Sequence, residues 1–253
     1  MKKLLTNVFI SCITILIFSC SCSEDNGHSN DVDTLNNYDE SGQISFAYEG
    51  ITDLKRGDII IRSNSNILPR TAYLEDGWGF GHAAIVTRGA SGEFPDSILA
   101  NAYVFESHAQ PVPQKYQLRE VKGLDINENP FLHNESFSPR YTGSRYRLRL
   151  NISEEEIERI IDFIVAQEGD LSSWNAMKRF PGNPEIEEQV KDGRRDNWAD
   201  NSHWYCSLLI WQAVFYVTGI DLDNNGGYFV YPNDIVVSHY FNNSESHIGR
   251  ARF

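Results

Sequence analysis

Short apolar runs bounded by turn residues dominate the middle of the chain, and such runs predict buried strands. Residues 59–61 are three isoleucines that follow a turn sequence at 55–58, and residues 83–87 form a second apolar run. Two more segments, 102–107 and the alternating 146–150, have the same character. The sequence therefore predicts a set of short strands in this part of the chain.

Longer polar segments separate or follow these runs. Residues 62–81 are polar and rich in glycine, and residues 109–144 contain several prolines, so both segments are predicted to be irregular. Residues 170–202 include Trp174 and Trp198 and are too long for a tight connection. We expect this segment to be either a covering loop with some helix or a partly disordered lid.

Two segments have helical patterns. The sequence Ser153-Glu154-Glu155-Glu156 is a capping box, in which a serine hydroxyl and a glutamate carboxylate bind free backbone N–H groups. Apolar residues at helical spacing follow it, and this helix is predicted to end near Gly169. The second helix is apolar on most sides, which predicts deep burial. Its predicted N-cap is Ser202, Cys206 falls in its first turn, and Gly219 is placed to end it.

The composition is that of a globular protein and limits the possible partners. A chain of 253 residues can bury the core of one domain, and its hydrophobic fraction of 41% and charged fraction of 23% are ordinary. The formal net charge is -13. Because phosphate binding needs clustered lysine and arginine, so acidic a chain is not expected to bind nucleic acid.

The first 22 residues have the pattern of an export signal. Met1-Lys2-Lys3 is a positive n-region, and the apolar run after it is shorter than the roughly 20 residues that a membrane span needs. The run ends at Ser19-Cys20, which resembles a bacterial lipobox. Cys20 is therefore the predicted lipidation site, with Cys22 as the alternative. A plain secretory signal with incidental cysteines is the competing interpretation.

This N-terminal pattern predicts a protein held in the bacterial cell envelope by a lipid anchor, in the periplasm or at the outer-membrane surface. The segment after the signal is rich in Ser, Asn, Asp and Glu and has too few apolar residues to build a core. The predicted organisation is a signal peptide and lipobox at 1–22, a flexible tether at 23–45 and one domain at 46–253.

Cys206 is the one cysteine expected in the folded domain, because Cys12, Cys20 and Cys22 all fall in the signal. A helix N-terminus concentrates partial positive charge, which stabilises a thiolate. An unpaired cysteine is a liability in an exported protein, so a function as a nucleophile is favoured over an inert buried thiol. The backbone N–H of Cys206 could also help to stabilise an oxyanion.

His82 and Glu106 are the candidate partners of this cysteine. His82 precedes the strand at 83–87, although a histidine there could equally be a surface or core residue. Alternate residues of a strand share a face, so Glu106 and His108 are expected to point the same way, and His108 is a second candidate partner and a substrate-binding candidate. A carboxylate inside an apolar run is costly unless it is paired. An imidazole oriented by Glu106 would complete a Cys-His-Glu triad.

Other candidates flank the cysteine. Tyr205 could donate a hydrogen bond to an oxyanion or simply pack, and Trp204 could line a substrate groove or cap the core. A zinc site that combines Cys206 with nearby histidines such as His203 is a further alternative, but no second close pair of ligands accompanies them. We therefore expect no metal and no cofactor.

Five short motifs occur in order along the chain. They are Gly57-Asp58-Ile59-Ile60-Ile61-Arg62, Gly81-His82-Ala83-Ala84-Ile85-Val86, Val104-Phe105-Glu106-Ser107, Tyr205-Cys206-Ser207-Leu208-Leu209-Ile210-Trp211 and Pro232-Asn233-Asp234. This ordered set resembles the circularly permuted branch of the NlpC-type papain-like cysteine hydrolases, often called YiiX-like, in which the histidine precedes the cysteine. The resemblance implies a compact α+β fold, in which a small antiparallel sheet or barrel carries the histidine and the acid and a packed helix carries the cysteine. It gives Cys206, His82 and Glu106 the roles of nucleophile, base and third member.

Proteins of that branch cleave amide bonds, including those of cell-wall peptides, or act on lipid-like acyl groups. We therefore expect a thiol hydrolase that cleaves an amide bond in peptidoglycan or another peptide. The alternatives are an acyl hydrolase or acyltransferase for a lipid or lipopeptide, and a non-catalytic binding lipoprotein that retains the fold. A lipid substrate predicts an apolar groove beside Cys206, a peptide substrate predicts polar groups there, and a binding protein predicts that Cys206 and His82 do not meet.

The chain departs from the family pattern at two places. Leu208 stands where the family tends to have a glutamate, and residues 169–174 stand where it tends to have a Gly-x-Tyr-Asp stretch. The second departure bears on the substrate, because that stretch precedes the cysteine.

Overall fold

The structure is a computed structural model that describes residues 51–64, 79–108, 113–123, 145–193, 197–223, 226–242 and 249–252. The chain divides into two compact units, Met1–Asp33 and Thr34–Phe253, and every described residue belongs to the second. The predicted signal, the lipidation site Cys20 and the predicted tether lie outside the described residues. Within the described ranges, no helix has the length and apolar character needed to cross a membrane.

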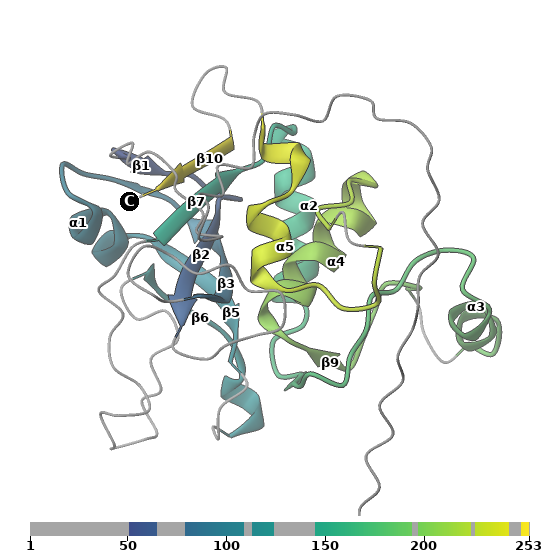
Figure 1. The fold of residues 1–253 in the computed structure, drawn as a ribbon. Coiled ribbons are helices and arrows are strands. Elements are labelled where there is room, and N and C mark those ends of the chain that lie inside the picture. Colours follow the sequence, from purple (N-terminus) through teal and green to yellow (C-terminus); the bar gives the residue numbers. More distant parts are fainter. Residues whose placement is uncertain are drawn as a thin grey trace, which may run out of the picture. The chain divides into compact units, whose positions relative to one another are not determined.

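A six-stranded sheet forms the centre of the described unit, in the order β10-β7-β2-β3-β5-β6 (Figure 1). Every neighbouring pair in this sheet is antiparallel. In sheet order the strands are Gly249–Arg252 (β10), Arg145–Arg149 (β7), Ile59–Asn64 (β2), Gly79–Arg88 (β3), Tyr103–Ser107 (β5) and Leu118–Lys122 (β6). Two small sheets join Asp53–Leu54 (β1) to Ala90–Ser91 (β4) and Leu171–Ser172 (β8) to His203–Trp204 (β9). The predicted α+β class with an antiparallel sheet is confirmed.

Helices pack on both sides of the large sheet. Figure 1 shows α2 (Glu154–Val165), α4 (Cys206–Thr218) and α5 (Pro232–Val236) on one side and the short helix α1 (Pro95–Asn101) on the other. The remaining helical elements are α3 (Pro184–Lys191), η1 (Gln114–Tyr116) and η3 (His239–Asn242). The capping box predicted for α2 is confirmed, because Ser153 accepts a hydrogen bond from the Glu156 N–H and donates its own N–H to the Glu156 carboxylate.

Side-chain alternation along the strands divides the apolar residues between two cores. Ile59 and Ile61 of β2 lie in the larger core, which also contains the buried faces of α2 and α4. Ile60 lies in the smaller core with Ile98 and Leu99 of α1. Because β2 is covered on both faces, its sequence is a continuous isoleucine run rather than an alternation of apolar and polar residues.

α4 packs against α2 and β3, and this explains why it is apolar on most sides. Its C-terminus is closed by Gly219, whose φ of 73° lies in the left-handed region that glycine favours. The predicted N-cap Ser202 was wrong, because α4 begins at Cys206. Residues 203–204 pair with β8 as a parallel strand, and the extended Tyr205 is the N-cap residue.

Two predicted loops also contain strand. β2 runs on to Asn64 and β3 starts at Gly79, so both ends of the predicted loop 62–81 belong to the sheet. Part of the segment 109–144 that was predicted to be irregular is strand β6. Backbone pairing does not require apolar side chains, and a strand whose side chains are partly exposed gives a weak apolar signal.

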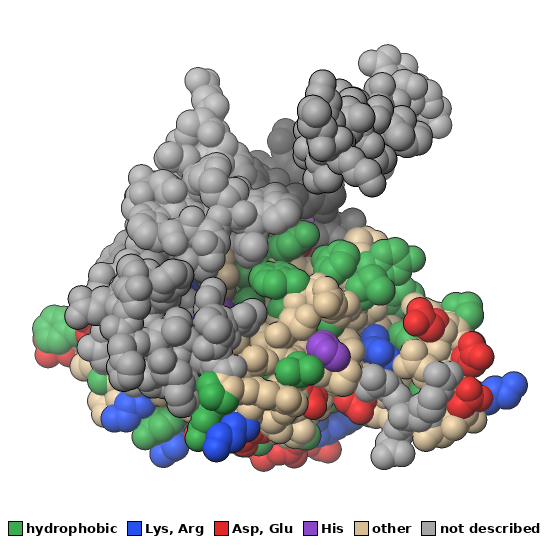
Figure 2. Space-filling model, turned by 90° about the horizontal axis from the view of Figure 1, so that it is seen from below, with side chains coloured by type: hydrophobic (Ala, Val, Ile, Leu, Met, Phe, Trp, Pro, Cys, Tyr) green, Lys and Arg blue, Asp and Glu red, His purple; other side chains and the backbone are tan. Residues whose placement is uncertain are grey.

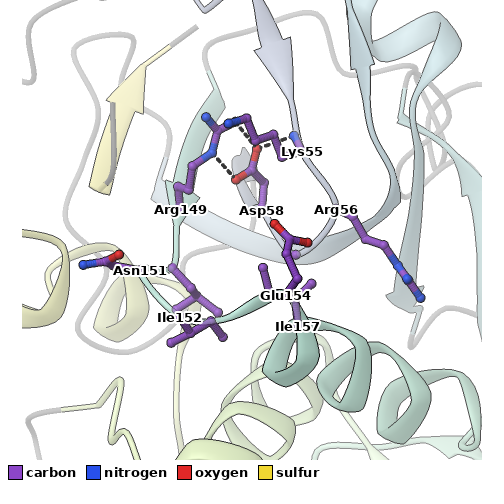
Figure 3. Close-up of a pocket in the computed structure, with 10 residues that line it drawn as sticks. Lys55, Arg56, Asp58, Arg149, Asn151, Ile152, Glu154 and Ile157 are labelled. Atoms are coloured by element: carbon purple, nitrogen blue, oxygen red, sulfur yellow. Dashed lines mark hydrogen bonds and ion pairs between the residues drawn. The ribbon is translucent and has the colours of Figure 1, made fainter. Parts of the chain in front are cut away.

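A buried carboxylate fixes the turn that leads into β2. Asp58 accepts two hydrogen bonds from Arg149 of β7, at 2.6 and 2.7 Å, and one from the Lys55 N–H at 2.7 Å (Figure 3). At Gly57, with φ 87°, a Cβ would come within 2.8 Å of Ile157 of α2. The turn therefore needs both the glycine and the aspartate.

We expect Asp58→Ala to lower the free energy of unfolding by about 3 kcal/mol, because it removes the two-point partner of the buried Arg149 guanidinium. Urea unfolding measures this change. The control is Glu158→Gln, which removes the exposed ion pair with Arg56 and should cost less than about 1 kcal/mol. Equal losses of unfolding free energy in the two variants would show that the buried Asp58–Arg149 pair stabilises the fold no more than the exposed pair does.

Candidate active site

Cys206 is the first residue of the 13-residue helix α4 and follows directly after the extended Tyr205. Its thiol is free and buried, with 5% of the residue exposed. At a helix N-terminus the backbone N–H groups lack acceptors within the helix and the helix dipole favours negative charge. Both properties stabilise the thiolate form of Cys206.

His82 and Glu106 face each other across the strands β3 and β5. The His82 Nε2 lies 2.9 Å from the Glu106 Oε2, and both side chains are buried. The sheet register accounts for this contact. Glu106 pairs with Ala84, so His82, two residues earlier in β3, is its diagonal neighbour on the same face.

Charge and hydrogen bonding between the His82 imidazole and the Cys206 thiol shift the pKa values of both groups. Because Nε2 is bonded to Glu106, Nδ1 is the ring nitrogen that remains for the sulfur. The structure therefore brings Cys206, His82 and Glu106 together in the chain of contacts that the sequence predicts. These three residues come from β3, β5 and α4.

The surroundings of Cys206 favour its thiolate. Burial alone would raise the pKa of the thiol, but the charge of His82 and its hydrogen bond outweigh burial and lower the pKa below its usual value. The backbone N–H groups of Ala83 and Ser207 also hydrogen-bond the sulfur and lower the pKa further. No local sequence pattern indicates the Ala83 contact, which depends on how α4 packs against β3.

The protonated form of His82 is favoured in turn. Burial acts to lower the pKa of the imidazole, but the charge and hydrogen bond of Cys206, followed by those of Glu106, raise it above its usual value. The lowered pKa of Cys206 and the raised pKa of His82 both act in favour of a thiolate–imidazolium pair.

Glu106 stays ionised although it is buried. Burial would raise the pKa of this carboxyl group, but the hydrogen bond and charge of His82, with the charges of His108 and Arg119, lower it to about 2. Arg119 lies directly opposite on β6 and donates two hydrogen bonds to the Glu106 Oε1, at 3.2 Å from Nε and 3.0 Å from Nη2. One carboxylate oxygen thus binds His82 and the other binds Arg119.

Sequence reasoning missed Arg119, because residues 109–144 were predicted to be irregular. The signal that was available is the alternation in Leu118-Arg119-Glu120-Val121-Lys122, in which only Leu118 is fully buried. His108 is buried, and its charge acts on Glu106, as expected from its predicted face. Its backbone N–H donates to the Gln117 carbonyl oxygen at 2.7 Å.

The aromatic residues before Cys206 are packed inside the protein. Trp204 has 0% of its surface exposed, and its indole N–H donates to Asp170 at 3.0 Å. The hydroxyl of Tyr205 accepts a hydrogen bond from the Val230 N–H at 3.1 Å, and burial raises the pKa of this phenol. Trp204 therefore offers no surface for a substrate groove, and Tyr205 has its hydroxyl engaged in the core. The exposed Trp174 stacks on the Tyr205 ring with a centroid distance of 4.6 Å.

The described part of the chain contains no cluster of three His, Cys, Asp or Glu side chains that could hold a metal ion. His203, a ligand in the zinc alternative, lies on β9 with its Nδ1 2.8 Å from the Ser202 hydroxyl. A pocket beside the Asp58 turn is lined by β7 and the start of α2 and includes none of the three triad residues (Figure 3). Its carboxylate Asp58 is bonded to Arg149, so the pocket is part of the structural ion-pair network.

We expect Glu106→Gln to lower the pKa of His82 by about 1 to 2 units, because a neutral amide no longer stabilises the imidazolium. A ¹³C-detected NMR titration of the His82 ring measures this change. Glu120→Gln is the matched control, since it makes the same change at the neighbouring exposed acid of β6. An unchanged His82 titration in Glu106→Gln would contradict the orienting role of Glu106.

Comparison with known proteins identifies a similarity over one segment of the chain. No protein-family model matches the chain, and no solved structure matches it. A protein of Bacillus subtilis (strain 168), described as uncharacterized protein YycO, is 33% identical to this chain over 92 residues. That similarity covers 36% of this chain and 31% of the Bacillus protein, so the chain matches less than a third of that relative's length.

Proposed function

We propose that the protein is a thiol hydrolase that cleaves an amide bond through a thioester acyl-enzyme, in the manner of a permuted papain-like enzyme. The observation that carries the proposal is the buried Cys206–His82–Glu106 chain of contacts at the start of α4. A nucleophile, a base within hydrogen-bond reach and a group that orients the base make up the arrangement used in covalent acyl transfer. The non-catalytic alternative predicts that Cys206 and His82 lie apart, whereas the interaction that shifts the pKa values of both groups supports the catalytic proposal.

The proposed steps follow from the contacts. The Cys206 thiolate attacks the carbonyl carbon of the amide, and the protonated His82 gives its proton to the departing amine. Water, activated by the same imidazole, then hydrolyses the thioester and restores the thiol. Glu106 holds the ring orientation and stabilises the imidazolium, while Arg119 holds the second oxygen of Glu106.

The N–H of Cys206 is the proposed donor to the oxyanion of the tetrahedral intermediate. It has no acceptor inside the helix, because Cys206 is the first helical residue. The Tyr205 hydroxyl, the donor considered from the sequence, accepts a hydrogen bond from the Val230 N–H in the core, and Tyr205 is only 1% exposed. We therefore assign no oxyanion role to Tyr205.

The order of the motifs supports the same proposal. His82 precedes Cys206 in the chain, as in the permuted branch that the sequence resembles, and no cofactor is required. If Cys20 carries a lipid anchor in the cell envelope, cell-wall peptides and acylated lipids or peptides lie within reach as substrates. The altered stretch at 169–174 contains β8, which pairs with the strand preceding Cys206, so it can shape the substrate site differently from the family.

We expect iodoacetamide to alkylate Cys206 rapidly at about pH 6, and at least about tenfold more slowly in His82→Ala. A free cysteine has a pKa near 8.5 and is almost entirely protonated at pH 6, whereas a thiolate paired with His82 is reactive there. The pKa of the thiol is lowered and that of His82 is raised, so wild-type reactivity should persist down to the pKa of Cys206 and be lost below it. Mass spectrometry of the peptide that contains Cys206 follows the reaction.

The control for this experiment is His239→Ala, which removes an exposed histidine on η3. It should leave the rate at pH 6 unchanged. Labelling that rises only above about pH 8 in the wild type, with no effect of His82→Ala, would exclude an activated thiolate in the resting protein.

A second candidate is an acyl hydrolase or acyltransferase for a lipid or lipopeptide, which would use the same triad. Exposed apolar side chains near Tyr205 favour it. Trp174 stacks on Tyr205. The Tyr228 carbonyl oxygen accepts a hydrogen bond from the Lys178 N–H, so the segments that carry the exposed Met177 and Tyr228 are neighbours. Figure 2 shows hydrophobic side chains gathered on one face of the molecule. Such a surface suits an acyl chain better than a charged peptide.

We expect Trp174→Ser and Tyr228→Ser to reduce a preference for long over short acyl esters by about tenfold, because each removes exposed apolar area from the proposed acyl-binding surface. Hydrolysis of p-nitrophenyl esters of increasing chain length measures the preference. Phe94→Ser, which removes an exposed apolar side chain next to α1, is the control. Unchanged preference in both variants would leave the amide substrate as the better candidate.

A further inference from the structure

A serine next to Glu106 connects the sheet to the segment that carries the nucleophile. The Ser107 hydroxyl donates a 2.8 Å hydrogen bond to the Trp204 carbonyl oxygen and lies 2.7 Å from the Ser172 hydroxyl. Since a hydroxyl group has one hydrogen and Ser107 gives its hydrogen to Trp204, Ser172 is the donor in the second contact. Ser107 is buried, with 3% of its surface exposed.

This hydrogen bond joins the two halves of the triad. Glu106 and Ser107 are neighbours in β5 and therefore point to opposite faces of the sheet. Glu106 reaches His82 on one face, and Ser107 reaches the backbone two residues before Cys206 on the other. A single strand thus fixes the base directly and the nucleophile through the backbone of β9.

The same hydrogen bond is not needed to complete β9. The Trp204 carbonyl oxygen also accepts a 3.0 Å hydrogen bond from the Ser173 N–H, as part of the pairing between β8 and β9. Loss of the Ser107 hydroxyl therefore leaves no orphaned backbone group. The loss removes the connection from β9 to β5 and the contact with the Ser172 hydroxyl.

The start of α4 is held from its other side as well. The Ser207 hydroxyl donates to the Val230 carbonyl oxygen at 2.8 Å, and the Val230 N–H donates to the Tyr205 hydroxyl at 3.1 Å. The residues before and after Cys206 are therefore both bonded to Val230. Ser107 supplies the one contact in this set that leads to the strand of Glu106.

We propose that Ser107 is a positioning residue, which sets the distance between the Cys206 sulfur and His82 by tying the Trp204 carbonyl to the strand of Glu106. The inference rests on the proposed function, because it assigns Ser107 a part in the reactivity of the same thiol. A residue with a purely structural role would change the stability of the fold without changing the pH dependence of that thiol.

The experiment measures the alkylation rate of Cys206 by iodoacetamide against pH on the full chain, together with the midpoint of urea unfolding. In Ser107→Ala the rate at about pH 6 should be about tenfold lower than in the wild type, with a smaller difference at about pH 9, where the thiol ionises without help from His82. The matched control is Ser172→Ala, which removes the other hydroxyl of the pair and keeps the bond from Ser107 to Trp204. It should keep nearly the wild-type rate, while both variants should show similar urea midpoints.

A second pair of variants separates the hydrogen bond from side-chain volume. Ser107→Thr keeps a hydroxyl donor and should retain most of the alkylation rate. Ser107→Val has the shape of the threonine variant without the donor and should behave like Ser107→Ala. A Ser107→Val protein as reactive as Ser107→Thr overturns the positioning role, as does a Ser172→Ala protein as slow as Ser107→Ala. A wild-type protein that reacts slowly at pH 6 overturns the proposed function and the positioning role with it, so the wild-type rate tells the two failures apart.

Discussion

The ionised carboxylate of Glu106 is the constraint around which the site is built. A charge buried in a sheet is tolerated only when each oxygen has a partner, and here the two oxygens bind His82 and Arg119. These partners come from the two strands that flank β5, so the carboxylate ties β3, β5 and β6 together through side chains as well as through the backbone. The orientation of His82, and through it the state of Cys206, depends on that arrangement.

The strands of the sheet and the helix α4 make different contributions to the site. The antiparallel register makes Arg119 the direct neighbour of Glu106 and His82 its diagonal neighbour, which positions the imidazole without loop residues. The helix supplies a thiol position with unsatisfied N–H groups and a favourable dipole. Sites carried on strands and helices hold their geometry better than sites on loops, because packing restricts the side chains on every side.

Much of this site was accessible from the sequence. Cys206 at a helix start, His82 beside a strand and Glu106 within one all follow from local patterns, because turn residues and apolar periodicity act over a few residues. The true start of α4 did not follow, because the extended state of residues 203–205 depends on pairing with β8, more than thirty residues earlier. Arg119 was missed for the same reason: its strand is defined by its pairing with β5 rather than by its own apolar content.

The order of the residues along the chain has little influence on such a site. His82 comes before Cys206 in this chain. The geometry of the site depends instead on which ring nitrogen of His82 faces the Cys206 sulfur and which binds the Glu106 carboxylate. The sheet that carries His82 is held together by its own backbone hydrogen bonds, and α4 packs on it as a separate element. The chain can therefore connect the sheet and α4 in a different order while the contacts among Cys206, His82 and Glu106 stay the same. What must be preserved is the junction between β5, β9 and the start of α4, because a small shift there separates sulfur from imidazole and the low-pKa thiolate is lost.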